Sequence, residues 1–280
     1  MVRRIPFVLL CAVLLPAVPS WGVPANTYTS GARAIQEANP NGESSGNYDL
    51  DWSYVYNVNG SSGVAIDDYW VLTAHHVADD GSANLTGHTA VETVYNYDAD
   101  LALVRYDTAL PSHYDYTSST SFSGSEVIMI GFGRNGNVTQ TASSGWWSQL
   151  SEENPDVLRW GTNTVDGLTT ITDTFGDSYS MLKTTISGTN AGTNTPYETG
   201  VNMGDSGGGM FANVADEWIL IGINAYRNTS SPYDTTYSVP VGDYATWIND
   251  TIATYTPEPA TLALLLLGGL TLLRRQRPQR

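Results

Sequence analysis

A serine packed among glycines marks the stretch VNMGDSGGGMF, residues 201–211. Gly204 and Gly207 belong to a set of glycines that removes side chains around Ser206, so the backbone can turn tightly and another molecule can approach the hydroxyl. These surroundings favour a nucleophile. Alone, the stretch also fits a turn in which glycine supplies positive φ angles and the serine makes only a local hydrogen bond.

A nucleophilic serine needs a base, and the chain contains 4 histidines. His75 and His76 end the apolar stretch YWVLTAHH, where we expect a strand to finish at a cleft. Asp98 and Asp100 stand just before the apolar stretch LALVRY, where a sheet edge can fix a carboxylate. An imidazole accepts the serine proton, and a carboxylate on its other nitrogen fixes the tautomer. The chain therefore carries the groups of an acyl-transfer site in the order His, Asp, Ser.

Short β-like runs bounded by Gly, Asn, Asp or Ser make up the body of the chain from about residue 45 to 241. They read SYVYNV, VAI, WVLTA, AVETVYNY, LALVRYD, EVIMIGFG, VLRWG, MLKTTIS, GGMF, WILIGINAY and TYSVPV. Only residues 242–255 have helical periodicity, with Tyr244, Trp247, Ile248 and Ile252 on one face. The sequence predicts an all-β body closed by a C-terminal helix.

A polar stretch at residues 111–125 divides these runs into two groups. It fits either a long surface loop inside one barrel or a linker between two barrels. We favour the linker, because so many strands pack more easily as two closed sheets. The predicted organisation is a first β-barrel at 45–110, the linker, and a second β-barrel with the C-terminal helix at 126–255.

Three motifs in this order resemble those of the chymotrypsin-like (trypsin-like) serine protease family, which are T-A-x-H, D-x-x-L and G-D-S-G-G. Here they read TAHH at 73–76, DLAL at 100–103 and GDSGG at 204–208. GFG at 131–133, GINAY at 222–226 and the YATWIND helix are further similarities. The resemblance implies two antiparallel six-stranded β-barrels with the active site in the cleft between them.

The same resemblance implies a role for each matching residue. Ser206 becomes the nucleophile, His76 the base and Asp100 the residue that orients it, while backbone N–H groups of Gly204 and Ser206 form the oxyanion hole. His75 stands where the family usually has alanine, and we interpret it as structural. Asp98 is interpreted as a solvated loop residue.

A substrate pocket also follows from the resemblance. Counting back six residues from Ser206 gives Gly200, where trypsin-type members carry the acid that selects Arg and Lys side chains. A tryptic preference is therefore not predicted. Val201, Met203 and Tyr226 favour an apolar or small pocket instead.

Activation in the family pairs the aspartate that matches Asp205 with a newly freed N-terminus. ARAIQ offers a cut after Arg33 that would free Ala34, although no close match to the family's I-V-G-G start is present. Asp205 as a simple turn former is the alternative. Ala225 stands where the family commonly has a serine that supports the buried aspartate.

The chain is acidic, with 28 Asp and Glu against 12 Lys and Arg and a formal net charge of −16. Between residues 23 and 255 the basic residues are only Arg33, Arg105, Arg134, Arg159, Lys183 and Arg227. Such a body repels nucleic acid and anionic membrane surfaces, so we expect no nucleic-acid partner. No cofactor is expected. No metal site is predicted either, because adjacent strand residues such as His75 and His76 point to opposite faces.

The N-terminal segment, residues 1–22, reads as a secretory signal peptide, with Arg3 and Arg4 before an apolar run and small residues near its end. That run holds Cys11, the only cysteine, so the exported chain is expected to have no disulfide. Residues 23–44 are an N-terminal segment or a possible propeptide.

The C-terminal segment, residues 256–280, combines a Pro-Glu-Pro triplet, an apolar run at 260–273 and a basic end. It resembles the PEP-CTERM sorting signal of Gram-negative bacteria. The resemblance implies transient membrane association, processing by an exosortase-type enzyme, and a final location at the cell surface or outside the cell. A plain tail anchor is the alternative, although the run is short for the hydrocarbon core.

Together these features predict an exported serine endopeptidase that acts on protein or peptide substrates through a Ser-His-Asp triad and an acyl-enzyme. Two alternatives remain. The chain can be a non-catalytic surface or matrix-binding protein on the same fold, or an esterase that shares the mechanism and differs in the leaving group.

Overall fold

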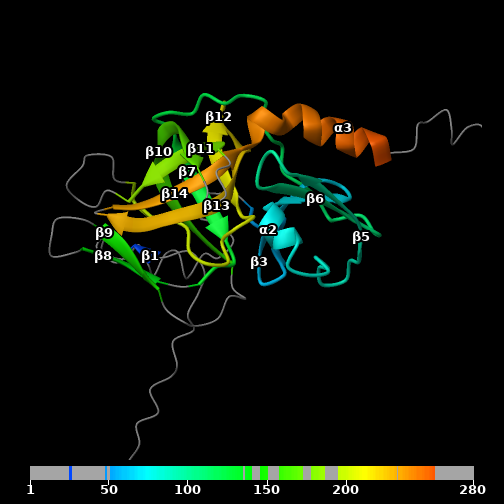
Figure 1. Ribbon diagram of the computed structural model, residues 1–280, viewed down its shortest axis with the longest axis horizontal. Helices are drawn as coiled ribbons and strands as arrows, with labels where there is room; N and C mark the ends of the chain where they lie inside the picture. Colours follow the sequence, from blue (N-terminus) through cyan, green and yellow to red (C-terminus); the bar gives the residue numbers. More distant parts are fainter. Residues whose placement is uncertain are drawn as a thin grey trace, which may run out of the picture.

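The computed structural model describes residues 25–26, 48, 51–134, 136–140, 146–150, 158–172, 178–186, 195–231 and 233–255. Strands dominate these residues, and a helix ends them (Figure 1). The structure therefore confirms the predicted all-β class with a C-terminal helix. The predicted signal peptide and sorting signal lie outside the described residues. Within the described part, no helix is long and apolar enough to cross a membrane.

The first sheet is antiparallel and has five strands in the order β2-β3-β4-β6-β5. The strands are β2 (Val55–Val58), β3 (Ser61–Asp67), β4 (Trp70–Thr73), β5 (Ala90–Asn96) and β6 (Leu101–Tyr106). β4 and β6 are almost entirely buried, and each pairs with a strand along both of its edges. The family resemblance implied six strands here, and the described residues form five.

The second sheet closes into the six-stranded barrel that the resemblance implied, in the order β10-β11-β14-β13-β12-β7. Its strands are β7 (Glu126–Gly131), β10 (Arg159–Thr172), β11 (Ser178–Thr185), β12 (Gly209–Val214), β13 (Glu217–Ser231) and β14 (Tyr233–Pro240). A small sheet of β1 (Ala25–Asn26), β8 (Gly136–Gln140) and β9 (Trp146–Leu150) was not predicted.

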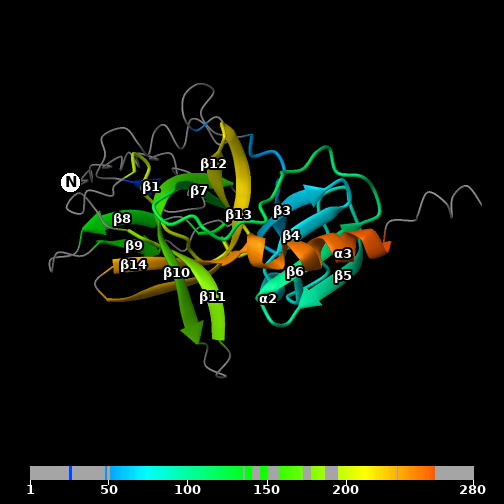
Figure 2. The ribbon, with the colours of Figure 1, turned by 90° about the horizontal axis from the view of Figure 1, so that it is seen from above.

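Two helices matter for the arrangement of the sheets. A 3-10 turn at Val241–Tyr244 leads into α3 (Ala245–Tyr255), which leaves the barrel and lies across the first sheet (Figures 1 and 2). Tyr255 at its end packs edge-on against Trp70 of β4, with ring centroids 5.4 Å apart. The helix that the sequence predicted for 242–255 therefore ties the two sheets together.

Aromatic side chains fill the junction between the sheets. Trp52 stacks with Trp160 of β10 at 6.1 Å and lies 6.3 Å from Phe211 of β12. Tyr114, in the segment between the sheets, packs edge-on against Phe211 at 4.9 Å. All four are buried, so the two sheets share one core at this point. A shared core fixes how the sheets dock, and the site described next lies across that junction.

Candidate active site

His76 and Asp100 meet at the end of the first sheet. β4 ends at Thr73 and the chain turns at once into the short helix α2 (His75–Ala78), so the histidines open a helical turn and do not continue the strand as predicted. The Nδ1 of His76 lies 2.7 Å from Oδ2 of Asp100. The backbone N–H of His76 also donates to Oδ1 of the same carboxylate at 3.1 Å. The two bonds fix both the ring and the turn that carries it.

The environment of this pair adjusts the basicity of the imidazole. Burial lowers the pKa of His76, but the hydrogen bond and the charge of Asp100, helped by the charge of Asp80, outweigh that effect. The net result is a pKa raised above the ordinary 6.5. The Asp100 side chain is only 6% exposed, whereas that of His76 is 46% exposed. The base is therefore held by a buried carboxylate and still open to a substrate.

His75 and Asp98, the neighbours of this pair in sequence, have other surroundings. The His75 ring makes edge-to-face contacts with Tyr95 at 4.9 Å and with Tyr97 at 5.1 Å. Asp98 is exposed, and its backbone N–H donates to the side chain of Asn96. These contacts agree with the interpretation of His75 as structural and of Asp98 as a loop residue.

The glycines around Ser206 have a conformational reason. Gly204 and Gly207 have φ angles of +92° and +81°, which side chains rarely adopt. A Cβ at Gly207 would lie 2.0 Å from the carbonyl oxygen of Ser62 and 2.2 Å from Oγ1 of Thr73. The loop of the barrel therefore passes directly against the first sheet, and only glycine fits at that contact.

Ser62 of β3 joins this loop to the first sheet, a role that no sequence pattern indicated. Its N–H donates to the carbonyl oxygen of Ser206 at 2.9 Å, and its hydroxyl donates to the carbonyl oxygen of Gly204 at 3.0 Å. The same hydroxyl accepts the N–H of Phe132 at 2.8 Å. With both carbonyl oxygens held, the N–H groups of Gly204 and Ser206 have no hydrogen-bond acceptor in the described part of the chain. They are available to a developing oxyanion.

Ser206 and His76 each contact the Ala225–Tyr226 segment of β13. The Ser206 hydroxyl lies 3.4 Å from the carbonyl oxygen of Ala225, a long contact that leaves it easy to redirect. The His76 ring stacks on Tyr226 with centroids 6.3 Å apart. Among the described residues no hydrogen bond joins the hydroxyl to the imidazole, and such bonds are often long before substrate binds.

A pocket of about 340 Å³ opens directly beside the Ser206 hydroxyl. Val201, Met203 and Tyr226, three of the predicted pocket residues, line it. Gly200 does not line it, and a Cβ there would lie 3.0 Å from Ile186. Asn202, Ser206, Ala225 and Arg227 complete the lining. Asn202 and Arg227 were not predicted; the scarcity of basic residues in the body was the signal that could have drawn attention to Arg227.

Asp205, next to the nucleophile candidate, is fully buried. Its carboxylate accepts the backbone N–H groups of Gly133 at 2.8 Å and of Asn202 at 2.7 Å. Burial raises its pKa to about 7, although these two donors and the charges of Arg227 and Arg159 oppose the rise. These two backbone N–H groups therefore hold Asp205, and with it the loop that carries Ser206, against the barrel.

Because the folded pKa of Asp205 is raised, its contribution to stability should fall as the pH rises. The unfolded chain releases this proton near pH 4 and the folded chain holds it to about 7, so the loss accumulates between those values at up to about 1.4 kcal/mol per pH unit. Urea unfolding of wild type and Asp205→Asn at pH 4 to 8 measures the difference. We expect Asp205→Asn to gain stability relative to wild type across that window. A difference in unfolding free energy between wild type and Asp205→Asn that does not change with pH would contradict this account. Asp98→Asn, which changes an exposed carboxylate, is the control.

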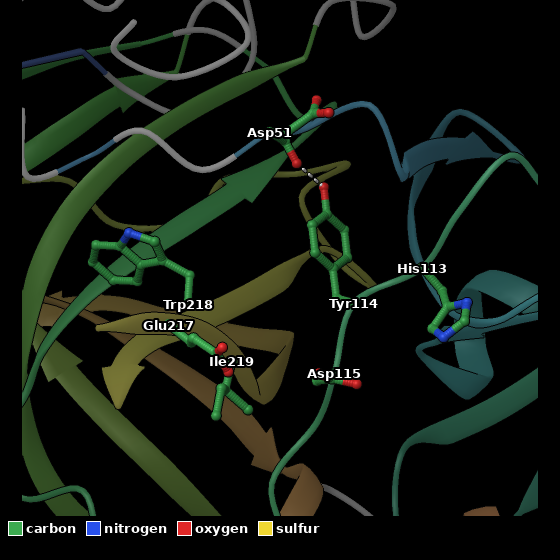
Figure 3. A pocket seen from close by; sticks show the side chains of 7 residues that line it. All are labelled: Asp51, His113, Tyr114, Asp115, Glu217, Trp218 and Ile219. Carbon is green, nitrogen blue, oxygen red and sulfur yellow. Dashed lines mark hydrogen bonds between the residues drawn. The ribbon is translucent and has the colours of Figure 1, made fainter. Parts of the chain in front are cut away.

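A second hollow, which Ser206 does not line, lies where the segment between the sheets passes the β12–β13 hairpin (Figure 3). It is lined by Asp51, His113, Tyr114, Asp115, Glu217, Trp218 and Ile219, and the Tyr114 hydroxyl donates to the carbonyl oxygen of Asp51. It contains none of the predicted catalytic residues. No group of three or more His, Cys, Asp or Glu side chains in the described residues has metal-binding geometry.

Comparison with known proteins gives one family match. A family model described as Trypsin matches residues 40–248. No curated protein matches the chain.

Solved structures with similar folds include three proteins. One is the passenger domain of plasmid encoded toxin, an autotransporter enterotoxin from enteroaggregative Escherichia coli, with 15% identity and a TM-score of 0.48 over 69% of this chain and 21% of that one. The Rv3671c protease of M. tuberculosis, in its inactive form, has 13% identity and a TM-score of 0.47, and the match covers 71% of this chain and 88% of that one. The NS6 protease of murine norovirus has 14% identity and a TM-score of 0.43, and the match covers 68% of this chain and 93% of that one. This chain therefore spans about a fifth of the toxin passenger domain.

Proposed function

Because the chain belongs to the trypsin family, with a protease domain of chymotrypsin-like fold, we propose that it is a serine endopeptidase whose catalytic residues are Ser206, His76 and Asp100. The observation that carries the proposal is the 2.7 Å contact between His76 and a buried Asp100 beside the loop of Ser206. The protease domain implies a peptide substrate. No cofactor takes part in the proposed reaction.

In the proposed mechanism the Ser206 hydroxyl attacks the carbonyl carbon of the scissile peptide bond, and Nε2 of His76 accepts its proton. Asp100 holds the proton on Nδ1, which leaves Nε2 free to act as the base. The N–H groups of Gly204 and Ser206 stabilise the negative oxygen of the tetrahedral intermediate. His76 then protonates the leaving amine. Water, activated by the same imidazole, releases the acyl group from Ser206.

Peptide and ester cleavage by the purified protein tests this proposal. Mixed peptide libraries and matched ester substrates are incubated with the protein, and mass spectrometry identifies the new ends. We expect internal cleavage of peptides that Ser206→Ala abolishes. Cleavage of esters alone would support the esterase alternative. A folded protein that cleaves neither would support the non-catalytic surface or matrix-binding alternative.

We also propose that the protein is exported and that its C-terminal segment, residues 256–280, is a PEP-CTERM signal removed by an exosortase-type enzyme. The apolar run and terminal arginines after the Pro-Glu-Pro triplet support this. Mass spectrometry of protein from cell and medium fractions should find chains that begin near residue 23 and end near residue 256. A full-length chain confined to the cytoplasm would contradict export.

A further inference from the structure

Arg227 is the one charged residue among the described residues that line the pocket beside Ser206. It follows Tyr226 on β13 and faces β14, where Asp234 lies fully buried. The Arg227 side chain is 12% exposed, so it is mostly covered and still forms part of the pocket wall. A buried cation in this position is unusual for an acidic protein with few basic residues.

The guanidinium of Arg227 is held in a defined orientation. Its Nε lies 2.9 and 3.0 Å from the two carboxylate oxygens of Asp234, and its Nη2 lies 2.5 Å from Oδ2. Its Nη1 donates to Oδ1 of Asn202 at 3.1 Å. The forked pairing with Asp234 is the strong geometry for an arginine and a carboxylate. The pair is therefore a fixed part of the pocket wall.

The pair is also connected to the loop of the nucleophile. Asn202 receives the Arg227 hydrogen bond, and its backbone N–H donates to the buried Asp205 at 2.7 Å. Its side-chain amide donates to the carbonyl oxygen of Arg134 at 2.9 Å. Asn202 therefore links the charged wall to the residue that precedes Ser206.

We propose that Arg227 sets the specificity of this pocket by occupying the position of a substrate cation and neutralising Asp234, so that the enzyme cleaves after uncharged residues and rejects lysine and arginine. The proposal rests on the endopeptidase function above. It goes further by assigning a residue that determines specificity, and by identifying a buried acid, Asp234, that pairs with the pocket residue Arg227 and is not offered to substrate.

The charges lead to this specificity in two steps. A lysine or arginine side chain that entered the pocket would meet the like charge of Arg227, and no acidic residue belongs to the described lining. The one nearby acid, Asp234, is already paired and buried. An acidic substrate side chain gains little, because the carboxylate of Asp234 already balances the guanidinium. Uncharged side chains face Val201, Met203, Ala225 and Tyr226 and meet none of these costs.

Removing the Arg227 side chain should therefore reverse the preference. Arg227→Ala opens a space that continues the pocket toward Asp234 and leaves that carboxylate without its main partner, which is a strongly unfavourable state. A cation from outside can then take the place of the guanidinium. In Arg227→Ala/Asp234→Asn the same space is present without the charge, so this double variant separates charge from size.

The first measurement is binding of benzamidine, a small planar cation, by calorimetry and thermal shift, and it requires no catalysis. We expect Arg227→Ala to bind benzamidine roughly 100-fold more tightly than wild type or the double variant. Lys183→Ala, which removes an exposed cation paired with Asp166 on the same barrel, is the matched control and should behave as wild type. Equal binding by wild type and a folded Arg227→Ala would overturn the proposal.

The second measurement is the ratio of kcat/KM for peptides with lysine or arginine before the scissile bond to kcat/KM for peptides with uncharged residues there. We expect this ratio to rise roughly 100-fold in Arg227→Ala and to stay low in the double variant. Wild-type cleavage that prefers lysine or arginine would overturn the proposal and leave the endopeptidase function intact. A wild type that cleaves nothing would instead contradict the function, and benzamidine binding would still test the pocket.

Arg227→Ala removes the main partner of the buried Asp234 carboxylate, so circular dichroism must first show that the variant folds. Arg227→Gln keeps one amide donor near Asp234 and replaces the alanine variant if that variant does not fold. We expect it to show the same gains in benzamidine binding and in the kcat/KM ratio, but smaller ones. If neither variant folds, the wild-type cleavage preference decides the proposal, because a preference for basic residues contradicts it directly.

Discussion

Replacing Ser206 with alanine is expected to lower kcat for peptide hydrolysis by roughly a million-fold, the scale of losing a triad nucleophile. The variant keeps the backbone N–H groups at positions 204 and 206 and all of the pocket except the Ser206 hydroxyl, so substrate binding should change little. Its free energy of unfolding should stay within about 0.5 kcal/mol of wild type, because the hydroxyl makes only a 3.4 Å contact with Ala225. Steady-state kinetics on one fluorogenic peptide, together with urea unfolding, measures both quantities.

A control serine makes this result specific. Ser121 is exposed in the segment between the sheets, so Ser121→Ala should leave both activity and stability unchanged. Retention of more than a small fraction of activity by Ser206→Ala, in protein purified free of contaminating proteases, would exclude Ser206 as the nucleophile. A large loss of stability in the same variant would contradict the weak contacts of its hydroxyl in the structure.

Asp100→Asn is expected to lower kcat roughly ten-thousand-fold with little change in KM. The carboxylate accepts hydrogen bonds from both Nδ1 and the backbone N–H of His76, and an amide cannot accept both and keep the same tautomer. An amide N–H directed at Nδ1 places the imidazole proton on Nε2, which can then no longer accept the serine proton. The substitution also removes the charge that raises the pKa of His76.

Asp98→Asn is the matched control for this prediction, since the same change is made two residues away on an exposed side chain. Full activity in Asp98→Asn beside a large loss in Asp100→Asn would support the assignment of the carboxylate. The reverse pattern would show that the loop before β6 presents a different acid to His76. A rise in KM with unchanged kcat in Asp100→Asn would show that Asp100 supports the pocket and not the imidazole.

The strands that the sequence patterns predicted best are those in which nearly every residue is buried. The stretches WVLTA and LALVRYD correspond to β4 and β6, because central strands covered on both sides read as apolar runs. The strands β8 and β9 were missed, since GNVTQ and WWSQL are short and lie between turn-rich stretches. The helical turn at His75 and His76 was also missed. Four residues are too few to show a period of 3.6.

Contacts between distant segments explain the rest of what the sequence did not predict. The motifs identified Ser206, His76 and Asp100 because each lies in a short contiguous pattern. Ser62 lies in no motif, and its role depends on two carbonyl oxygens more than a hundred residues away in the chain. Arg227 and Asp234 are paired by the register of β13 and β14, which their spacing alone does not determine. Docking and register are properties of the folded sheets.

Covalent labelling of the folded protein with a fluorophosphonate is the most direct test of the central claim that the two sheets assemble a working nucleophile. The probe phosphonylates a serine only where a base and an oxyanion hole activate it. We expect the adduct on Ser206 by mass spectrometry of the digested protein, and no adduct in His76→Ala. An adduct on another serine, or equal labelling of Ser206 in wild type and His76→Ala, would contradict the account, as would a folded wild type that is not labelled at all.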